Sequence, residues 1–403
     1  MQMKNIPLAI LIGATLVAPL ASAQSTVTVY GKLYPFVINE EGTGATAVGT
    51  AVSTLAAKPT GSNGVANLSG MASGNSRLGF RGQEDLGDGL KAEFQLEMAI
   101  AVDSGAAGSS TALFNRNTFV GIEGKLGSLK MGVIDTIFKD YGDTLGTLGI
   151  SSGTFMSTSD VLRKTGFGTS SASSFHLRRN NSIKYETPVV AGFQAGMQYS
   201  TDEAKTATRD PQVISIGLQY DVGPLYLAIA HEIHDDLFGG SRNVASSKRN
   251  NGASDPTNSR DRATQFTVEY RVGKKHKFEF DVIRKEYNEN ASVTGRFESY
   301  KNTAFLLAME SRWGDLWRTS AQYVKSNAGS CTLVGAPCTT DGLDGSKIGV
   351  GAAYYLSKRT YLFGLASRIT NGTSARYNNS ELSDAPNPGE DITQVAFGLS
   401  HSF

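Results

Sequence analysis

The sequence is poor in the residues that mark several common protein classes. It has two cysteines and two tryptophans in 403 residues, and its 38 Lys and Arg nearly balance its 37 Asp and Glu, for a formal charge of +1. Nucleic-acid binding needs a basic excess, so we expect no nucleic-acid partner. After residue 20 no apolar run reaches the ~20 residues of a membrane-spanning helix. The hydrophobic fraction of 40% is too high for a disordered chain.

The N-terminus has the pattern of an export signal. Lys4 precedes an apolar stretch from residue 6 to residue 20, and Ala21-Ser22-Ala23 follows with the small residues of a cleavage site. A membrane anchor is the competing interpretation, but the apolar stretch is too short to span a bilayer. The sequence predicts that residues 1–23 are a cleaved signal peptide and that 24–403 form the mature chain.

The two cysteines, Cys331 and Cys338, lie seven positions apart in a polar segment. An even pair in an exported chain favours a small loop disulfide over a metal site.

The mature chain alternates apolar and polar residues over segments of about ten. Residues 90–100 are typical, with Leu90, Phe94 and Met98 on one face and Glu93 and Glu97 on the other. This period of two predicts β-strands, because successive strand side chains point to opposite faces. The same pattern recurs at Ile214/Ile216/Leu218/Tyr220/Val222, Phe266/Val268/Tyr270/Val272, Ile348/Val350/Ala352/Tyr354/Leu356, Tyr361/Phe363/Leu365 and Val395/Phe397/Leu399/His401/Phe403.

Two kinds of connection alternate between these strands. Seven are tight turns, such as those at 86–89, 222–224 and 313–315. Eight are long polar loops, at about 40–75, 101–114, 139–180, 201–212, 236–262, 289–302, 326–345 and 372–391. Fifteen connections predict sixteen antiparallel strands in one all-β domain spanning 24–403.

Sixteen strands with short turns at one end and long loops at the other are typical of a transmembrane β-barrel with short periplasmic turns and long external loops. A soluble β-sandwich would need apolar faces packed on cores and linkers between domains, and we find no linker. The polar strand faces predict a water-filled lumen. We expect aromatic residues near strand ends to form interfacial girdles, among them Tyr30, Phe36, Tyr185, Tyr199, Tyr220, Tyr270, Tyr323, Tyr354, Tyr361 and Phe403.

Several motifs resemble the general porins of betaproteobacterial outer membranes. They are SRLGFRGQEDLGDGLKAEFQLE (76–97), FNRNTFVGIEGKLGSLKMG (114–132), RRNNSIKYETPVVAGFQAGMQYS (178–200), YYLSKRTYLFG (354–364) and VAFGLSHSF (395–403). The resemblance runs from VTVYGKLYPFV (27–37) to the last residue. It implies a homotrimer of sixteen-stranded barrels amid outer-membrane lipid and lipopolysaccharide, with a third loop folded into each barrel. It also implies that Phe403 is part of the signal read by the barrel-assembly machinery.

The loop from Lys139 to Asn180 is the third long loop, and its length favours a functional role. It carries three carboxylates, Asp140, Asp143 and Asp160. We expect it to narrow the lumen.

Basic residues are expected on the lumen wall opposite this loop. We propose a cluster of Arg77, Arg116 and Arg178, the positions at which the resemblance implies arginines in anion-preferring relatives, with Arg81, Lys130 and Arg179 as a second tier. Charged rings raise the local concentration of counter-ions and so set ion preference. The sequence departs from its relatives at Val133, where an arginine is lost, and the lumen is expected to carry Glu84, Glu93 and Glu97. The alternative is that the arginines are paired or solvated charges with little influence on selectivity.

Nothing in the sequence indicates a catalytic or metal site. His231 and His234 lie three apart in a strand and so face opposite sides, unlike the histidines of a helical zinc motif. We therefore expect no enzyme activity, metal or cofactor.

The sequence thus predicts a passive outer-membrane channel for ions and small hydrophilic solutes, with a preference for anions. One alternative is a substrate-selective porin for small anions such as carboxylates or phosphate. Another is an adhesin or receptor barrel whose loops bind a partner. Tyr34 and Tyr226 are expected inside the barrel, but two residues do not make the aromatic row of a sugar channel.

Overall fold

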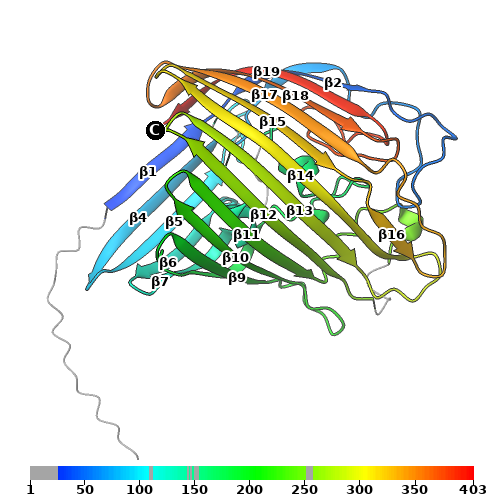
Figure 1. The fold of residues 1–403 in the computed structure, drawn as a ribbon, viewed down its shortest axis with the longest axis horizontal. Coiled ribbons are helices and arrows are strands. Elements are labelled where there is room, and N and C mark those ends of the chain that lie inside the picture. Colours follow the sequence, from blue (N-terminus) through cyan, green and yellow to red (C-terminus); the bar gives the residue numbers. More distant parts are fainter. Residues whose placement is uncertain (1–25, 109–111, 143–144, 146–147, 149–153, 251–256) are drawn as a thin grey trace, which may run out of the picture.

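A computed structural model describes residues 26–108, 112–142, 145, 148, 154–250 and 257–403. The described chain forms one closed antiparallel barrel, with the strands tilted across its wall (Figure 1). None of its helices within these ranges is long and apolar enough to cross a membrane.

The barrel wall consists of sixteen strands, some of them interrupted. β1 and β2 together form the first wall strand, β3 and β4 form the second, and β16 extends the wall beside β14. The strands are β1 (Thr26–Leu33), β2 (Phe36–Thr43), β3 (Leu68–Ala72), β4 (Arg77–Gly87), β5 (Leu90–Ala99), β6 (Thr118–Gly124), β7 (Gly127–Asp135), β8 (Arg178–Glu186), β9 (Phe193–Thr201), β10 (Gln212–Val222), β11 (Leu225–Asp235), β12 (Arg260–Val272), β13 (His276–Asn288), β14 (Phe297–Trp313), β15 (Trp317–Ser326), β16 (Ser330–Leu333), β17 (Gly345–Tyr355), β18 (Thr360–Asn371) and β19 (Asp391–Ser402).

The last strand closes the barrel against the first. β19 pairs with β18 on one side and with β1 and β2 on the other, with Ala396 opposite Ile38 and Ser402 opposite Lys32. The backbone of Phe403 exchanges two hydrogen bonds with Gly31. Closure pairs the backbone groups that an open edge would leave free. The predicted sixteen-stranded barrel is confirmed.

The two ends of the barrel differ as predicted. Short turns form one end, which we call the short-turn rim, and several of them use glycine in the left-handed region, such as Gly223 (φ 60°) and Gly273 (φ 59°). Long loops form the other end, and β13 and β14 reach furthest toward it (Figure 1).

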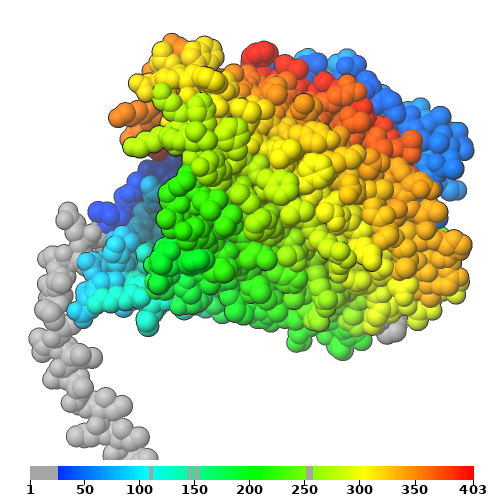
Figure 2. All heavy atoms as spheres, viewed as in Figure 1, coloured from blue at the N-terminus to red at the C-terminus, as the bar shows by residue number. Residues whose placement is uncertain are grey.

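The outer face of the wall carries the apolar belt that lipid requires. Ile216, Leu218, Phe266, Ile348 and Phe397 are each at least 41% exposed. Figure 2 shows the outside of the wall as a continuous curved surface. Outward tyrosines, including Tyr185, Tyr199, Tyr270 and Tyr323, match the expected girdle.

Several residues expected in the girdle or on the outer face lie inside instead. Phe36, Tyr361 and Phe363 are buried in an inner cluster with Phe155 and Met156 of the third loop. Tyr30 also faces the lumen, where its hydroxyl donates to Glu97 at 2.9 Å. The prediction was wrong here because the alternation of side chains separates the two faces of a strand but does not show which face contacts lipid. An apolar face can also cover an internal loop.

Glu84 is placed on the opposite side from that expected. It shares the outer face of β4 with Leu78 and Phe80 and pairs across the ladder with Ala92. The carboxylate lies near the short-turn rim, so it does not contribute to the lumen.

The described segments of the third loop (136–177) fold into the barrel. It contains α1 (Ile137–Tyr141), α2 (Ser159–Leu162) and η1 (Ser171–Ser173). α1 contacts β9, β10 and β11, and α2 contacts β14, β15 and β17. Residues 178–180, expected within the loop, begin β8.

Four other long loops join over the long-loop end. The first loop (44–67) places Leu55, fully buried, in a cluster with Phe167 of the third loop and Val244 of the fifth loop (236–259), which contains η2 (Ser246–Lys248). Ala245 N donates to Leu55 O at 2.9 Å. Ser53 Oγ donates to Thr339 O of the seventh loop (327–344) at 2.7 Å. We call this assembly the roof.

The roof includes a disulfide and a buried carboxylate. Cys331 is bonded to Cys338, and both pack against the apolar cluster of the roof. Glu390, fully buried at the end of the eighth loop (372–390), accepts hydrogen bonds from the backbone of Gly64 and Val65 in the first loop.

Candidate functional site

Two buried lysines hold the third loop against the barrel wall. Lys347 Nζ donates to the carbonyl oxygens of Phe155 and Ser157, each at 2.6 Å. Lys285 Nζ donates to Leu162 O at 2.8 Å and to Lys164 O at 2.7 Å. Both lysines are 0% exposed. A charged donor stabilises carbonyl groups that would otherwise be buried without partners.

Sequence analysis missed these anchoring lysines. The sequence shows each of them as a lysine near the middle of the polar face of a strand. That pattern does not distinguish a lysine that lines the pore from one that anchors a loop. Tyr287 adds a third contact, since its hydroxyl donates to Ser173 O at 2.5 Å. The loop supplies its own cation, Arg163, which is fully buried and donates to Gln265 Oε1 at 2.9 Å.

The carboxylates of the third loop are also anchors. Asp140 is paired with Lys184 of β8. Asp160 is paired with Lys347 of β17 at 3.0 Å and with Lys164 at 3.4 Å. Asp143 lies outside the described residues. Asp140 and Asp160 therefore fix the loop rather than presenting free charge.

The predicted arginines meet on the wall that the described parts of the loop leave open. Arg77, the first residue of β4, lies 3.6 Å from Glu97 of β5. Arg116, just before β6, is hydrogen-bonded to the other carboxylate oxygen of Glu97. One carboxylate thus holds two arginines, and it also accepts from Tyr30.

Arg178 completes this group from β8. Its guanidinium donates to Asn117 Oδ1 at 3.0 Å and to Asp135 at 3.1 Å. Asp135 also receives Lys139 Nζ at 2.8 Å. One carboxylate, Asp135, therefore pairs with both Arg178 and Lys139, just as Glu97 pairs with both Arg77 and Arg116.

The three second-tier residues, Arg81, Lys130 and Arg179, do not lie together. Arg81 stacks on the Tyr30 ring at 4.9 Å, and Lys130 lies 3.4 Å from Glu93 and over the Phe119 ring. Both face the lumen. Arg179 instead pairs with Asp202, at the long-loop end of β9 and away from the other arginines.

Lys32 belongs to the same wall, although sequence analysis did not single it out. It lies on the inner face of β1, over the rings of Tyr34 and Tyr361 at 5.1 and 5.7 Å. We use the term basic wall for Lys32, Arg77, Arg81, Arg116, Lys130 and Arg178.

The basic wall keeps a positive excess despite its ion pairs. Within the part of the chain that the structure describes, the ion pairs of the six cations involve three carboxylates, Glu93, Glu97 and Asp135. The exposed fraction of the paired side chains Arg77, Arg116, Lys130 and Arg178 ranges from 18% to 29%, so each reaches the lumen. Such an arrangement attracts anions into a narrow passage.

The described ranges contain no cluster of three or more His, Cys, Asp or Glu arranged to hold a metal ion. His234 and Glu232 are buried together on the lumen side, 2.8 Å apart, while His231 contacts Thr264 on the outer face. The two histidines therefore lie on opposite faces, as predicted.

A closed sixteen-stranded barrel with an apolar belt, a polar lumen and one loop folded inside defines the class of outer-membrane-type β-barrels. The chain belongs to the Gram-negative porin family, because the sequence model of that family matches residues 8–374.

Individual relatives match more locally in sequence. The chain is 33% identical over 145 residues to the major outer membrane protein P.IB of Neisseria lactamica. The aligned segment covers 36% of this chain and 38% of that protein. The chain thus spans about two fifths of the length of this relative.

Solved structures match over nearly the whole fold. An anion-selective porin from Comamonas acidovorans has a TM-score of 0.69 at 23% identity, covering 94% of this chain and all of that one. OmpT of Vibrio cholerae, solved in a trimer form, has a TM-score of 0.61 at 14% identity, covering 94% of this chain and 99% of that one.

Proposed function

We propose that this protein forms a water-filled outer-membrane channel through which ions and small hydrophilic solutes diffuse passively, with a preference for anions. The observation that carries the proposal is the position of the third loop. Arg163, Lys285 and Lys347 fix its described segments against β12, β13 and β17. The basic wall lies elsewhere around the lumen, on β1, β4, β7 and β8 and just before β6. A diffusing ion would therefore pass the cations at close range, where screening is weak.

The proposal includes assembly and export. We infer a homotrimer, which is supported by the sequence resemblance and by the trimer form of the similar Vibrio protein. We infer that residues 1–23 are removed on export, and that Phe403, whose backbone closes the barrel against Gly31, is read during insertion. Lipid and lipopolysaccharide would surround the apolar belt. No catalytic activity is proposed.

Reversal potentials test the anion preference. Purified protein in a planar bilayer under a salt gradient is expected to show conductance steps in threes and a reversal potential on the anion side. The variants Arg77→Ala, Arg116→Ala and Arg178→Ala should each shift that potential toward zero. Arg179→Ala is the matched control, because Arg179 pairs with Asp202 away from the basic wall.

Three results would contradict parts of the proposal. Cation preference in the parent protein would refute anion selectivity. Equal shifts in the control and the wall variants would remove the basic wall as its cause. Folded protein without conductance would refute the channel itself and favour a receptor barrel.

A further inference from the structure

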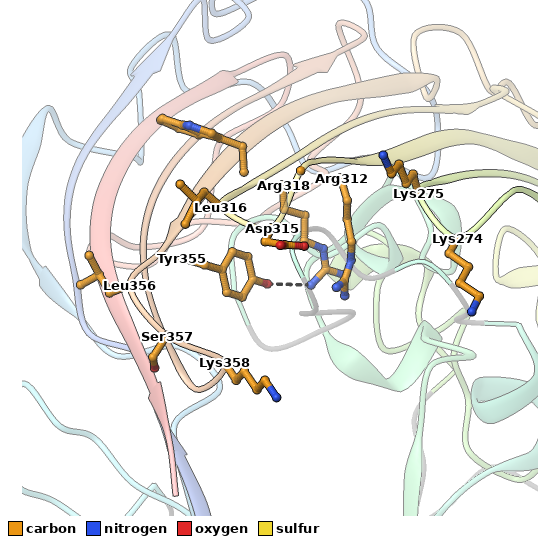
Figure 3. Close-up of a pocket in the computed structure, with 12 residues that line it drawn as sticks. Lys274, Lys275, Arg312, Asp315, Leu316, Arg318, Tyr355, Leu356, Ser357 and Lys358 are labelled. Atoms are coloured by element: carbon orange, nitrogen blue, oxygen red, sulfur yellow. Dashed lines mark hydrogen bonds between the residues drawn. The ribbon is translucent and has the colours of Figure 1, made fainter.

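One pocket lies at the short-turn rim, outside the basic wall. Its volume is about 850 Å³, and three successive turns form it: 273–275, 314–316 and 356–359. Five cations and one acidic residue, Asp315, line it. One of the cations is Arg318, and we call the other four the rim cations: Lys274, Lys275, Arg312 and Lys358. Figure 3 shows the lining side chains, with Arg318 beside Arg312 and hydrogen-bonded to Tyr355.

The charges of this pocket differ from those of the basic wall in their pairing. Arg77, Arg116, Lys130 and Arg178 each contact a carboxylate. By contrast, the ion pairs of the described residues include none of the four rim cations. Arg318 pairs with Glu310 below the opening and donates to the Tyr355 hydroxyl at 3.3 Å. The rim therefore keeps a local excess of positive charge without internal neutralisation.

We propose that this pocket is a binding site for small multivalent oxyanions, meaning solutes with two or more phosphate or carboxylate groups. Three features support that class. Ammonium and guanidinium groups form their strongest hydrogen bonds with such oxygens. The cations come from the turn 273–275, the end of β14 and the turn 356–359, so a ligand with several charged groups can contact more than one of these segments at a time. The volume fits a small solute.

The site makes the channel asymmetric. In barrels of this kind the short turns face the periplasm, so an oxyanion on that side meets the rim before it meets the basic wall. From the long-loop side it meets the roof first. Binding at the rim therefore reduces ion flow when the ligand is added from the short-turn side.

Binding is tested directly on folded protein in detergent by titration calorimetry with sodium tripolyphosphate. We expect saturable binding in the parent protein. The double variant Lys274→Gln, Lys358→Gln should weaken it by about tenfold, because each lysine comes from a different turn and contributes a separate contact. The matched control is Lys91→Gln, Lys125→Gln, which removes two lysines from the same rim outside the pocket. Equal loss in both variants, or no binding in the parent, overturns the proposal.

Sidedness is tested in planar bilayers. Biotin on Thr206→Cys, an exposed position of the fourth loop (202–211), reports orientation through block by streptavidin from one compartment. Tripolyphosphate should reduce the current at lower concentration from the opposite compartment, and the double variant should lose that difference. Equal block from both sides would place the site at the basic wall and overturn the proposal.

The two experiments also separate this inference from the channel function. Calorimetric binding without any conductance would refute the channel while leaving the rim site. Conductance without calorimetric binding would refute the rim site while leaving the channel function.

Discussion

Lys347 and Asp160 form an ion pair of 3.0 Å between β17 and the third loop, and the same ammonium donates to two carbonyl oxygens of that loop. Lys347 is fully buried, and its ion pair among the described residues is with the loop. The loop and the wall thus depend on each other for the burial of a charge.

Replacing this lysine is expected to release the loop. Lys347→Met leaves Asp160 and two carbonyl groups without their shared partner, at a cost of roughly 3 kcal/mol to the loop contact. Single-channel recordings should show larger conductance fluctuations than the parent protein. Lys325→Met is the control, because Lys325 forms a more exposed pair with Asp344. Quiet channels of unchanged conductance in Lys347→Met would contradict the anchoring role.

Glu97 limits the positive charge of the basic wall. Glu97→Gln leaves Arg77 and Arg116 without their shared counter-charge. The reversal potential under a salt gradient should therefore move further to the anion side, opposite to the effect of removing either arginine. Glu84→Gln, on the outer face of the neighbouring strand, should leave it unchanged. A shift toward cations in Glu97→Gln would mean that the two arginines are held in place chiefly by this carboxylate.

The eighth loop is expected to respond to pH through Glu381. Burial raises the pKa of Glu381 to about 8, and the carboxylates of Asp160 and Glu40 add to the shift while the Lys347 ammonium opposes it. An acid with a raised pKa favours the folded loop in its protonated form. This contribution is full below the ordinary value of 4.5 and is lost as pH rises through about 8.

Hydrogen exchange measures this effect. Opening of residues 376–387, corrected for intrinsic exchange, should increase between pH 6 and pH 9 in the parent protein. Glu381→Gln, which stays neutral, should show no such increase. The same pH response in both proteins would assign it to another group.

The disulfide is expected to stabilise the seventh loop locally. Closing a loop of about eight residues contributes roughly 2.5 kcal/mol in the chain-entropy model. Cys331→Ser with Cys338→Ser should speed proteolysis within residues 327–344, while the thermal unfolding of the barrel stays within a few degrees of the parent. A large drop in barrel stability would instead show that the seventh loop supports the wall.

The strands were predictable because turn length and alternation are local properties. Short turns with glycine and long polar loops gave the strand number, and the outer positions of β10, β12 and β19 followed from period two. The faces of Tyr361 and Phe363 could not be assigned in the same way, since they depend on contact with Phe155, more than 200 positions away.

The candidate site was predictable in part. Arg77, Arg116 and Arg178 were proposed from the resemblance to anion-preferring relatives, and the structure brings them together through Glu97, Asp135 and Asn117. The role of Lys347 depends on where the third loop lies. Arg179, adjacent to Arg178 in sequence, is carried to Asp202 because the register of β7 and β8 shifts between Gly132 and Ile134.

The roof connects the exposed outer surface of the long loops to the third loop inside the barrel. Leu55 of the first loop is buried in the same cluster as Phe167 of the third, while Val48 on the same loop is 73% exposed. Substitutions at positions like Val48 can change the outer surface without touching the passage. Substitutions at Leu55 act on both at once. We therefore expect the exposed positions of the first loop to vary freely. The buried positions are constrained, because under the proposed channel function a change there also alters permeability.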